Sequence, residues 1–285
     1  MFELLPLKRM LYLAALAICA VVLRAATPEY SIQAIRYATA ANVPLSEFVV
    51  GISPELGKQK IDAVMAVWLV RGGGHTILVD SGFHRDTFSK DFGVKDYLRP
   101  DEAVKLAGVQ PDQVTDIVIT HAHWDHMGGI DLFSKAQVWI QKEEFSYYTG
   151  AAWQQGRDHG GIDPEDVKEL VALNVEGRLH LLEGDDVELF PGIRAYTGSR
   201  HTFASQYLLI GGAVPFVLAS DNVYLYRNLS EHLASATFSD ADHAANIAQQ
   251  ARMIKLAGSA ERVVPGHDML QFERFSTHGR IANIK

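Results

Sequence analysis

The sequence predicts a protein of the α/β class (α+β in some schemes), in which two β-sheets pack face to face and helices cover their outer faces. Three observations support this prediction. Apolar runs of strand length recur in both halves of the chain, helical stretches separate them, and neither repeats nor a Pro- or Ser-rich linker divide the 285 residues. Strand-rich halves punctuated by helices fit such a layered architecture.

The first 26 residues have the features of a signal peptide. Lys8 and Arg9 form a basic region, residues 10–23 are an apolar stretch, and Ala25 and Ala26 are small residues before the expected cleavage point. A membrane-spanning helix needs about 20 apolar residues, so this stretch is short for one. We expect residues 27–285 to form a single exported domain, periplasmic or secreted, with no membrane segment after cleavage. An uncleaved N-terminal anchor is the alternative.

Cysteine content and charge restrict the class of function. Cys19 is the only cysteine and lies in the targeting segment, so the mature domain has neither a disulfide nor a thiolate ligand. Ile18 is bulky for the residue before a lipid-modified cysteine, which argues against a lipoprotein site. The net charge of −8 disfavours nucleic acid as a partner. Hydrophobic residues at 48% and charged residues at 21% are typical of a globular domain.

Elements of the first half follow one another at short spacing. A Gly-Gly-Gly reversal at residues 72–74 predicts a hairpin between two of the strands. A short helix is expected at residues 101–107. The predicted strands are residues 31–39, 61–71, 75–80, 116–120 and 136–141.

The second half begins with a helical and aromatic stretch at residues 143–180. Its aromatic side chains, with Trp124, are candidates for an apolar lid over a substrate, and ordinary packing is the alternative; they are Phe145, Tyr147, Tyr148 and Trp153. Helical spacing returns at residues 242–256. The predicted strands are residues 179–182, 187–189, 193–197, 206–210, 214–219 and 262–264.

The strongest functional signal is His121-Ala122-His123-Trp124-Asp125-His126, directly after the apolar run at residues 116–120. A strand that ends there brings three imidazoles and a carboxylate to the carboxyl edge of a sheet, where α/β proteins place ligand sites. Imidazole nitrogens and carboxylate oxygens suit zinc and similar divalent ions. An open catalytic site takes about three protein ligands, so four such side chains indicate the start of two metal sites. A metal-free polar loop is the alternative, although clustered imidazoles repel one another when protonated.

Three later residues are candidates for the remaining ligands. His201 and Asp221 each follow an apolar run, and His267 follows another through the turn Pro265-Gly266, which implies a defined backbone there. Side chains at such positions leave the core and point into an edge cleft. An ordinary loop role is the alternative for each of them.

With these motifs the sequence resembles the metallo-β-lactamase superfamily, metal-dependent hydrolases with a four-layer αβ/βα sandwich. The resemblance covers roughly residues 60–275 and includes His-x-His-x-Asp-His at residues 121–126. Arg200 departs from the glycine that many members carry before the third His, and Phe203-Ala204 replaces a usual Pro-Gly. The resemblance implies two divalent metal ions per chain, one held by His121, His123 and His201 and the other by Asp125, His126 and His267, with Asp221 as a bridge.

Within the superfamily the sequence is most similar to N-acyl homoserine lactonases, which share the bridging Asp and a Tyr three residues after it, here Asp221 and Tyr224. This likeness implies a quorum-quenching hydrolase that opens a lactone ring by attack of a metal-bridging hydroxide. Tyr224 would stabilise the oxyanion and Asp125 would carry a proton to the leaving oxygen. A packing role beside Tyr226 is the alternative for Tyr224. His and carboxylate ligands accept Zn, Mn, Fe or Co, and we expect zinc.

Other members of the superfamily are the alternatives for function. Exported metallo-β-lactamases lack a carboxylate at the position of Asp221, and glyoxalase-type thioester hydrolases carry a basic C-terminal segment that the short tail after His267 does not supply. Nucleases are disfavoured by the acidic charge and the signal peptide. A non-catalytic relative is disfavoured because all seven ligand positions are filled. A small lactone or ester is therefore the expected substrate.

Overall fold

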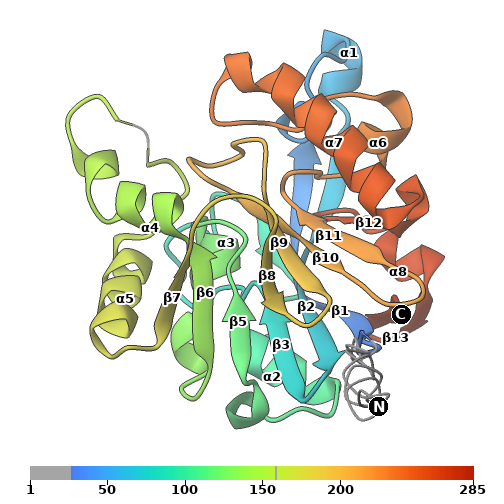
Figure 1. Cartoon of the computed structure of the whole chain (residues 1–285). Helices are drawn as coiled ribbons and strands as arrows, with labels where there is room; N and C mark the ends of the chain where they lie inside the picture. Colours follow the sequence, from blue (N-terminus) through green and yellow to red (C-terminus); the bar gives the residue numbers. More distant parts are fainter. Residues whose placement is uncertain (1–26, 158) are drawn as a thin grey trace, which may run out of the picture.

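The computed structural model describes residues 27–157 and 159–285, and the predicted signal peptide at residues 1–26 lies outside this part. Two β-sheets pack face to face, and helices cover the outer face of each sheet, which makes four layers (Figure 1). The predicted class, with two covered sheets, is confirmed.

The larger sheet contains nine strands in the order β13-β14-β1-β2-β3-β5-β6-β7, with β4 paired to β1. Strands β3, β5, β6 and β7 run parallel, so their carboxyl ends meet at one edge of the sheet. The bounds are β1 (Ser31–Pro44), β2 (Lys60–Gly72), β3 (His75–Val79), β4 (Val94–Lys95), β5 (Asp116–Val118), β6 (Gln137–Gln141), β7 (Leu179–Leu182), β13 (Ser276–His278) and β14 (Ile281–Asn283).

The smaller sheet contains five strands in the order β12-β11-β10-β9-β8, and its β11 and β12 run parallel. Its bounds are β8 (Val187–Phe190), β9 (Ile193–Thr197), β10 (Gln206–Ile210), β11 (Phe216–Ser220) and β12 (Val263–Pro265).

Helices α4 and α5 lie outside the larger sheet, and α7 crosses the outer face of the smaller one (Figure 1). The α-helices are α1 (Pro54–Gly57), α2 (Pro100–Leu106), α3 (Trp124–Met127), α4 (Lys142–Tyr148), α5 (Pro164–Val175), α6 (Tyr226–Glu231), α7 (His243–Ala257) and α8 (Gln271–Arg274). The short 3-10 helices are η1 (Leu45–Glu47), η2 (Pro111–Gln113), η3 (Ile130–Leu132), η4 (Ala151–Trp153), η5 (Asp240–Asp242) and η6 (Ala260–Arg262).

The side chains of β2 show why the layers stack in this way. Val67 and Leu69 belong to the apolar core under the helices of the larger sheet, whereas Trp68 and Val70 belong to the core between the sheets. Successive side chains of a strand point to opposite faces, so a strand that is apolar at every position is stable only when both faces are buried. Full burial of one such side chain stabilises the fold by about 1.5–3 kcal/mol.

The smaller sheet follows the same rule. Leu208 of β10 packs between the sheets, while its neighbour Tyr207 packs with Met253 of α7 on the outer face. Helix α7 ends at Ala257, and Gly258 follows it with a φ of 79°, the left-handed conformation that glycine adopts without strain.

Two predicted elements are corrected by the structure. The helical stretch expected at residues 143–180 is two helices, α4 and α5, separated by a loop that contains Gly156, Gly160 and Gly161. Asp163 accepts a hydrogen bond from the backbone of Glu165 and so starts α5 anew. The strand expected from residue 214 begins at Phe216, because Pro215 has no backbone N–H to donate to a ladder.

Within residues 27–157 and 159–285, no helix combines the length and the apolar character that a membrane span requires.

Candidate metal centre

Four loops at one end of the sheets bring the seven predicted ligands together. His121 and His123 follow β5, and Asp125 and His126 lie in the single turn of α3. The other three follow the smaller sheet's strands, namely His201 after β9, Asp221 after β11 and His267 after β12. Their donor atoms form two groups, each with all atoms within 4.8 Å of one another: His121, His123, His201 and Asp221 in the first, and Asp125, His126 and His267 in the second.

The first group has the spacing of a tetrahedral site. Nδ1 of His123 lies 3.1 Å from Nε2 of His121 and 3.0 Å from Nε2 of His201. Oδ2 of Asp221 lies 3.4 Å from Nε2 of His201. Ligand atoms placed about 2.0–2.1 Å from one zinc ion at tetrahedral angles are about 3.3 Å apart. The donors of this group therefore fit a single divalent ion.

The second group shares Asp221 with the first. Oδ1 of Asp221 lies 3.4 Å from Nε2 of His126, and its Oδ2 lies 3.0 Å from Nε2 of His267. Nε2 of His126 also lies 3.4 Å from Oδ2 of Asp125. Asp221 thus stands between the two groups, which is the position that a bridging carboxylate requires.

Two buried atoms of these groups support metal binding independently. Among the described residues, Nε2 of His126 and Oδ1 of Asp221 have no hydrogen-bond partner. An unsatisfied buried polar atom costs about 1–3 kcal/mol. Both atoms face the space between the donor atoms, where a cation would bind. The residues present therefore fit a divalent ion.

A further set of contacts orients the imidazoles. In four of the histidines Nδ1 faces an oxygen acceptor, which directs Nε2 toward the cluster. The contacts are His121 with Oγ1 of Thr120 at 3.0 Å, His126 with Oδ2 of Asp80 at 2.8 Å, His201 with the carbonyl of Ala236 at 3.1 Å and His267 with the carbonyl of Val64 at 2.8 Å.

His123 is placed differently, because it presents Nδ1 to the cluster. A Cβ atom added to Gly161 would lie 3.0 Å from Cδ2 of His123, and Gly161 also has a φ of 71°. The absence of a side chain at this position lets the imidazole ring lie against the backbone. Gly161 is therefore part of what positions this ligand.

Asp80 is a functional residue that our sequence prediction missed. It follows β3 with a φ of 60°, is fully buried, and accepts hydrogen bonds from the backbone N–H of Thr120 at 2.8 Å and from Oγ of Ser220 at 3.1 Å. Together with its contact to His126, it joins the ends of β3, β5 and β11. A carboxylate directly after an apolar strand and before Ser81-Gly82 is the sequence signal that points to it.

Burial and charge give the two groups different electrostatics. Burial and the neighbouring imidazoles lower the pKa of His121 well below its usual range, and burial lowers the pKa of His123 to about 3. These rings are neutral at pH 7, as a metal ligand must be. Burial also disfavours a charged His126, but Asp125, Asp221 and Asp80 outweigh it and raise the pKa of His126 well above its usual range. The carboxylates around His126 therefore favour positive charge at the second group.

Comparison with known proteins agrees with this centre. A family model described as the metallo-beta-lactamase superfamily matches residues 66–267, more than half of the 285 residues. The chain belongs to this superfamily. The resemblance and the fold predicted from the sequence are therefore confirmed, and the chain is a metal-dependent hydrolase whose two His/Asp clusters are consistent with a dinuclear site.

Several relatives of this superfamily member carry more specific names. The chain is 26% identical over 206 residues to the N-acyl homoserine lactonase AiiB of Agrobacterium fabrum, covering 64% of this chain and 71% of the relative. A solved quorum-quenching N-acyl homoserine lactone lactonase matches with a TM-score of 0.70 at 20% identity, over 87% of this chain and 95% of the other. AidC, a dizinc quorum-quenching lactonase solved with N-hexanoyl-L-homoserine as product, matches with a TM-score of 0.62 at 16% identity, over 85% and 88%.

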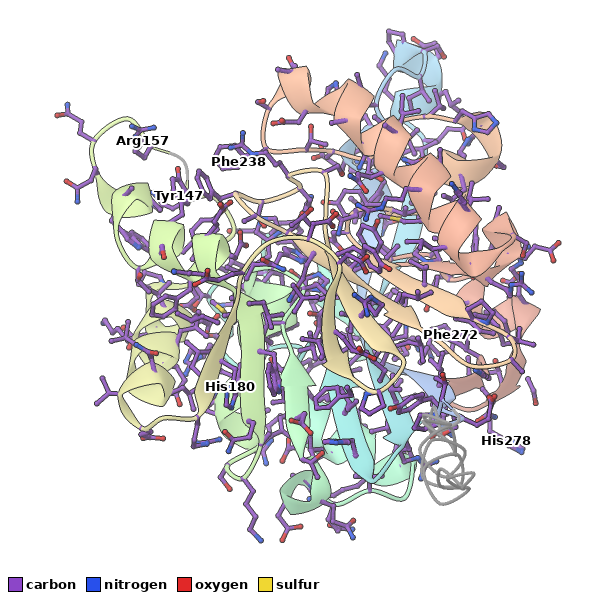
Figure 2. All side chains as sticks on the ribbon, in the orientation of Figure 1. Tyr147, Arg157, His180, Phe238, Phe272 and His278 are labelled. Atoms are coloured by element: carbon purple, nitrogen blue, oxygen red, sulfur yellow. The ribbon has the colours of Figure 1, made fainter. Side chains whose placement is uncertain are left out.

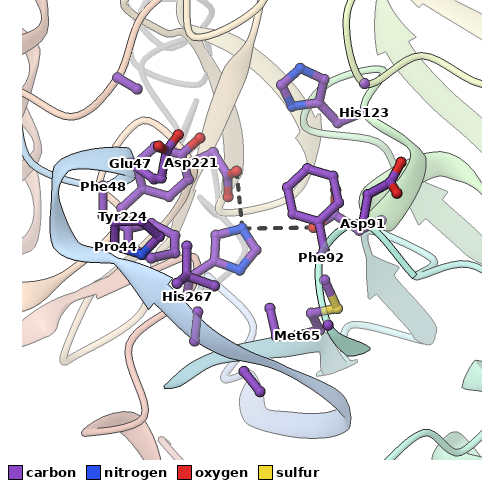
Figure 3. Close-up of a pocket in the computed structure, with 18 of the residues that line it drawn as sticks. Pro44, Glu47, Phe48, Met65, Asp91, Phe92, His123, Asp221, Tyr224 and His267 are labelled. Atoms are coloured by element: carbon purple, nitrogen blue, oxygen red, sulfur yellow. Dashed lines mark hydrogen bonds and ion pairs between the residues drawn. The ribbon is translucent and has the colours of Figure 1, made fainter. Parts of the chain in front are cut away.

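A cavity of about 650 Å³ opens onto the metal centre of this superfamily member. Figure 3 shows His267 beside Asp221, with Tyr224 and Phe48 to one side and Phe92 across the cavity. One end of the cavity is polar and is lined by His123, Asp125, Asp221, Tyr224 and His267. An apolar wall includes Val43, Phe48, Met65, Phe92 and Trp124, and the charged residues Glu47, Lys60, Lys90 and Asp91 also line the cavity.

The aromatic lid expected from the sequence is only partly found here. Trp124 lines the cavity. The four aromatic side chains predicted from residues 143–180 do not line it in the described part of the chain. Tyr147 instead stacks on Phe203 at 4.0 Å and meets Phe238 at 6.0 Å (Figure 2). Phe48 and Phe92 form the apolar wall instead, and only the tertiary structure reveals this.

Tyr224 places a hydroxyl group at the polar end. Its ring packs edge-on against Phe48 at 5.2 Å, and its oxygen lies 3.5 Å from Nδ1 of His201. Burial, together with the charges of Asp221 and Asp125, raises the pKa of Tyr224 well above its usual range. The phenol is therefore protonated at neutral pH and can donate a hydrogen bond.

Arg200, the departure noted in the sequence, adopts a φ of 55° directly before His201. This left-handed conformation explains why a glycine suits the position. Here the guanidinium group lies 5.2 Å from the ring centres of both Phe203 and Phe238, and such cation–π contacts are stabilising. The change of residue leaves His201 in its group.

Proposed function

We propose that this chain is a lactonase that opens the ring of N-acyl homoserine lactones, with two divalent ions, zinc in our expectation, in the two clusters. One observation supports the proposal: the Tyr224 hydroxyl, an Asp221 that lies between the two clusters, and a cavity with an apolar wall meet at one site. The named relatives support the same substrate class.

The chemistry divides between the ions and the protein. Two divalent ions in the clusters would polarise the lactone carbonyl and acidify a nucleophilic water. The O–H of Tyr224 then donates a hydrogen bond to the oxyanion as the carbonyl carbon becomes tetrahedral. The protein thereby stabilises charge that develops only in the transition state.

We assign the proton transfer to Asp125. Its side chain is 11% exposed and lines the cavity, and the hydroxyl of Tyr37 holds its backbone carbonyl at 2.7 Å. Burial opposes ionisation of Asp125, but His126 and His267 outweigh this effect and lower its pKa, so the carboxylate is charged and accepts a proton. We infer that the Asp125 carboxylate takes one proton of the attacking water and passes it to the ring oxygen as the ring C–O bond breaks, so the ring oxygen leaves as an alcohol. The second proton of the water goes to solvent when the new carboxylic acid ionises.

The apolar wall supplies a place for the acyl chain. Phe92 is 43% exposed at the cavity and lies 5.5 Å from Trp124, which is almost fully buried. Each methylene buried against such a wall contributes about 0.8 kcal/mol. Longer acyl chains should therefore lower KM until the wall is covered.

A substrate panel tests the proposal. Acyl homoserine lactones of increasing chain length, a simple unacylated lactone, a thioester and a carbapenem are assayed by acid release at constant pH. We expect chelator-sensitive hydrolysis that is fastest for acylated lactones. Faster turnover of the carbapenem or the thioester would replace this proposal with the corresponding alternative.

We further propose that the protein is exported, on the basis of the predicted signal peptide at residues 1–26. N-terminal sequencing of the protein from its native host tests this, with Thr27 as the expected first residue. Met1 at the N-terminus of the folded protein would contradict cleavage.

A further inference from the structure

Glu144 is a buried carboxylate next to the metal centre to which the mechanism above gives no role. It lies in α4, directly after β6, and none of its surface is exposed. Oε1 accepts hydrogen bonds from the backbone N–H of Ala122 at 2.9 Å and from Oγ1 of Thr202 at 2.6 Å. Oε2 accepts one from the backbone N–H of Ala204 at 2.6 Å.

These three donors belong to two loops that come from different sheets. Ala122 stands between His121 and His123 after β5, whereas Thr202 and Ala204 follow His201 after β9. The carboxylate therefore connects the two segments that supply the imidazoles of the first metal group. The contact between Nδ1 of His123 and Nε2 of His201, at 3.0 Å, spans this junction.

The chemistry of the contact requires a carboxylate. Both of its oxygens face donors, and an ionised carboxylate is the side chain that accepts at both ends. A glutamine of the same shape would turn its NH2 group toward an N–H or O–H donor. Burial raises the pKa of Glu144 to about 7, although the hydrogen bonds from its three partners oppose the shift. A buried carboxyl is therefore costly, and an apolar side chain would be more stable if the position served packing alone.

We propose that Glu144 is a positioning residue that sets the separation of His123 and His201 and thereby the affinity of the first metal group. The second group takes His267 from the loop after β12, which Glu144 does not contact in the described structure, and His267 and His126 are oriented by Val64 and Asp80. Ala122 is also in the segment that supplies Asp125 and His126, but Asp80 orients His126, so we expect the effect of Glu144 mainly at the first site. This inference rests on metal binding by the two clusters and is independent of the lactone substrate.

Cobalt binding to the metal-free protein tests the proposal without any measurement of hydrolysis. Titration with Co²⁺ alone is followed by its visible absorption, which reports ligand geometry. We expect Glu144→Gln to weaken one site about 10–100-fold and to alter the spectrum of that site, as loss of an orienting group does in other metal sites. The other site should be weakened much less.

Two controls identify the site and exclude an unspecific effect. Glu143→Gln changes the exposed neighbour on the same helix and should leave both affinities unchanged. In a His267→Ala background, which removes a ligand of the second group, the same loss should appear in the remaining site. Wild-type affinities and spectrum in Glu144→Gln overturn the proposal, and so does an equal weakening of both sites.

A milder variant decides the matter if Glu144→Gln does not fold. Thr202→Val removes one donor and keeps the carboxylate with its two backbone partners. The loss of one hydrogen bond should weaken the first site about threefold to tenfold. Unchanged cobalt affinity in folded Thr202→Val would overturn the proposal.

Discussion

Oδ2 of Asp80 lies 2.8 Å from Nδ1 of His126, and these side chains are only 0% and 2% exposed. This contact joins the end of β3 to the helical turn that carries Asp125 and His126 of the second metal group. Because Nδ1 of His126 is held by the carboxylate, Nε2 faces Asp125 and Asp221. The orientation of the ligand ring is thus set before a metal ion binds.

Asp80→Asn tests this relationship. The amide has the same size but can offer its NH2 group to Nδ1, which favours a proton on Nε2 and opposes ligation. We expect metal affinity to fall about 10–100-fold, measured by competition with a chelator. Asp112→Asn, at an exposed carboxylate, is the control and should have no effect. Equal affinities in the two variants would remove Asp80 from the centre.

Ligand removal separates the bridging residue from the others. His123→Ala should lower the metal content by one ion per chain, because His123 belongs to one group. Asp221→Ala should weaken both sites, because its oxygens face both groups. Elemental analysis after dialysis measures the stoichiometry. Two retained ions in both variants would be incompatible with the dinuclear assignment.

Tyr224→Phe tests the oxyanion donor. We expect kcat to fall about 10²–10³-fold, which corresponds to an activation free energy raised by about 3 kcal/mol. The metal content should not change. Tyr226→Phe is the control, because Tyr226 is not among the described residues that line the cavity. Since the pKa of Tyr224 is raised well above its usual range, the wild-type rate should show no alkaline loss from this phenol. Normal turnover in Tyr224→Phe would exclude the donor role.

Shortening the wall residue Phe92 tests the acyl site. Phe92→Ala should raise KM for long-chain lactones by about tenfold, equivalent to about 1.4 kcal/mol of lost apolar contact, while short-chain substrates change little. Leu106→Ala alters an exposed apolar residue on α2 and serves as the control. A uniform change across chain lengths would show that Phe92 does not contact the acyl group.

The stability of the metal-free protein should depend on pH through Asp166. Burial raises the pKa of Asp166 to about 7, although Arg85 contacts the carboxylate and opposes the shift. An unfolded Asp ionises near pH 4, so between about pH 4 and pH 7 the folded state binds the extra proton and the contribution of Asp166 to stability falls as pH rises.

Asp166→Asn removes this dependence. The unfolding free energy of the variant minus that of the wild type should increase by about 1–3 kcal/mol between about pH 5 and pH 8. Urea unfolding at both pH values measures the difference. The same difference at both pH values would show that Asp166 is ionised in the folded protein throughout.

Much of the fold could be predicted because its strands are apolar along their length. The strand expected at residues 193–197 is β9 as observed, and the run before the histidine motif is β5. The prediction of one helical stretch at residues 143–180 was wrong because both ends have helical spacing and we gave too little weight to the glycines between them. Whether a helix is interrupted depends on which backbone positions are packed and which are exposed. Hydrophobic spacing alone does not contain this information.

The sequence by itself determined the family and the seven side chains at the centre, because four of them lie in six consecutive residues and the other three each follow a strand. Only the tertiary structure decided how they are held. Asp80 and His126 are 46 residues apart, Val64 and His267 are 203 apart, and Glu144 meets two loops from different sheets. The physical reason is that a hydrogen bond between distant segments depends on how two sheets pack, whereas a ligand motif within one loop is determined by covalent neighbours.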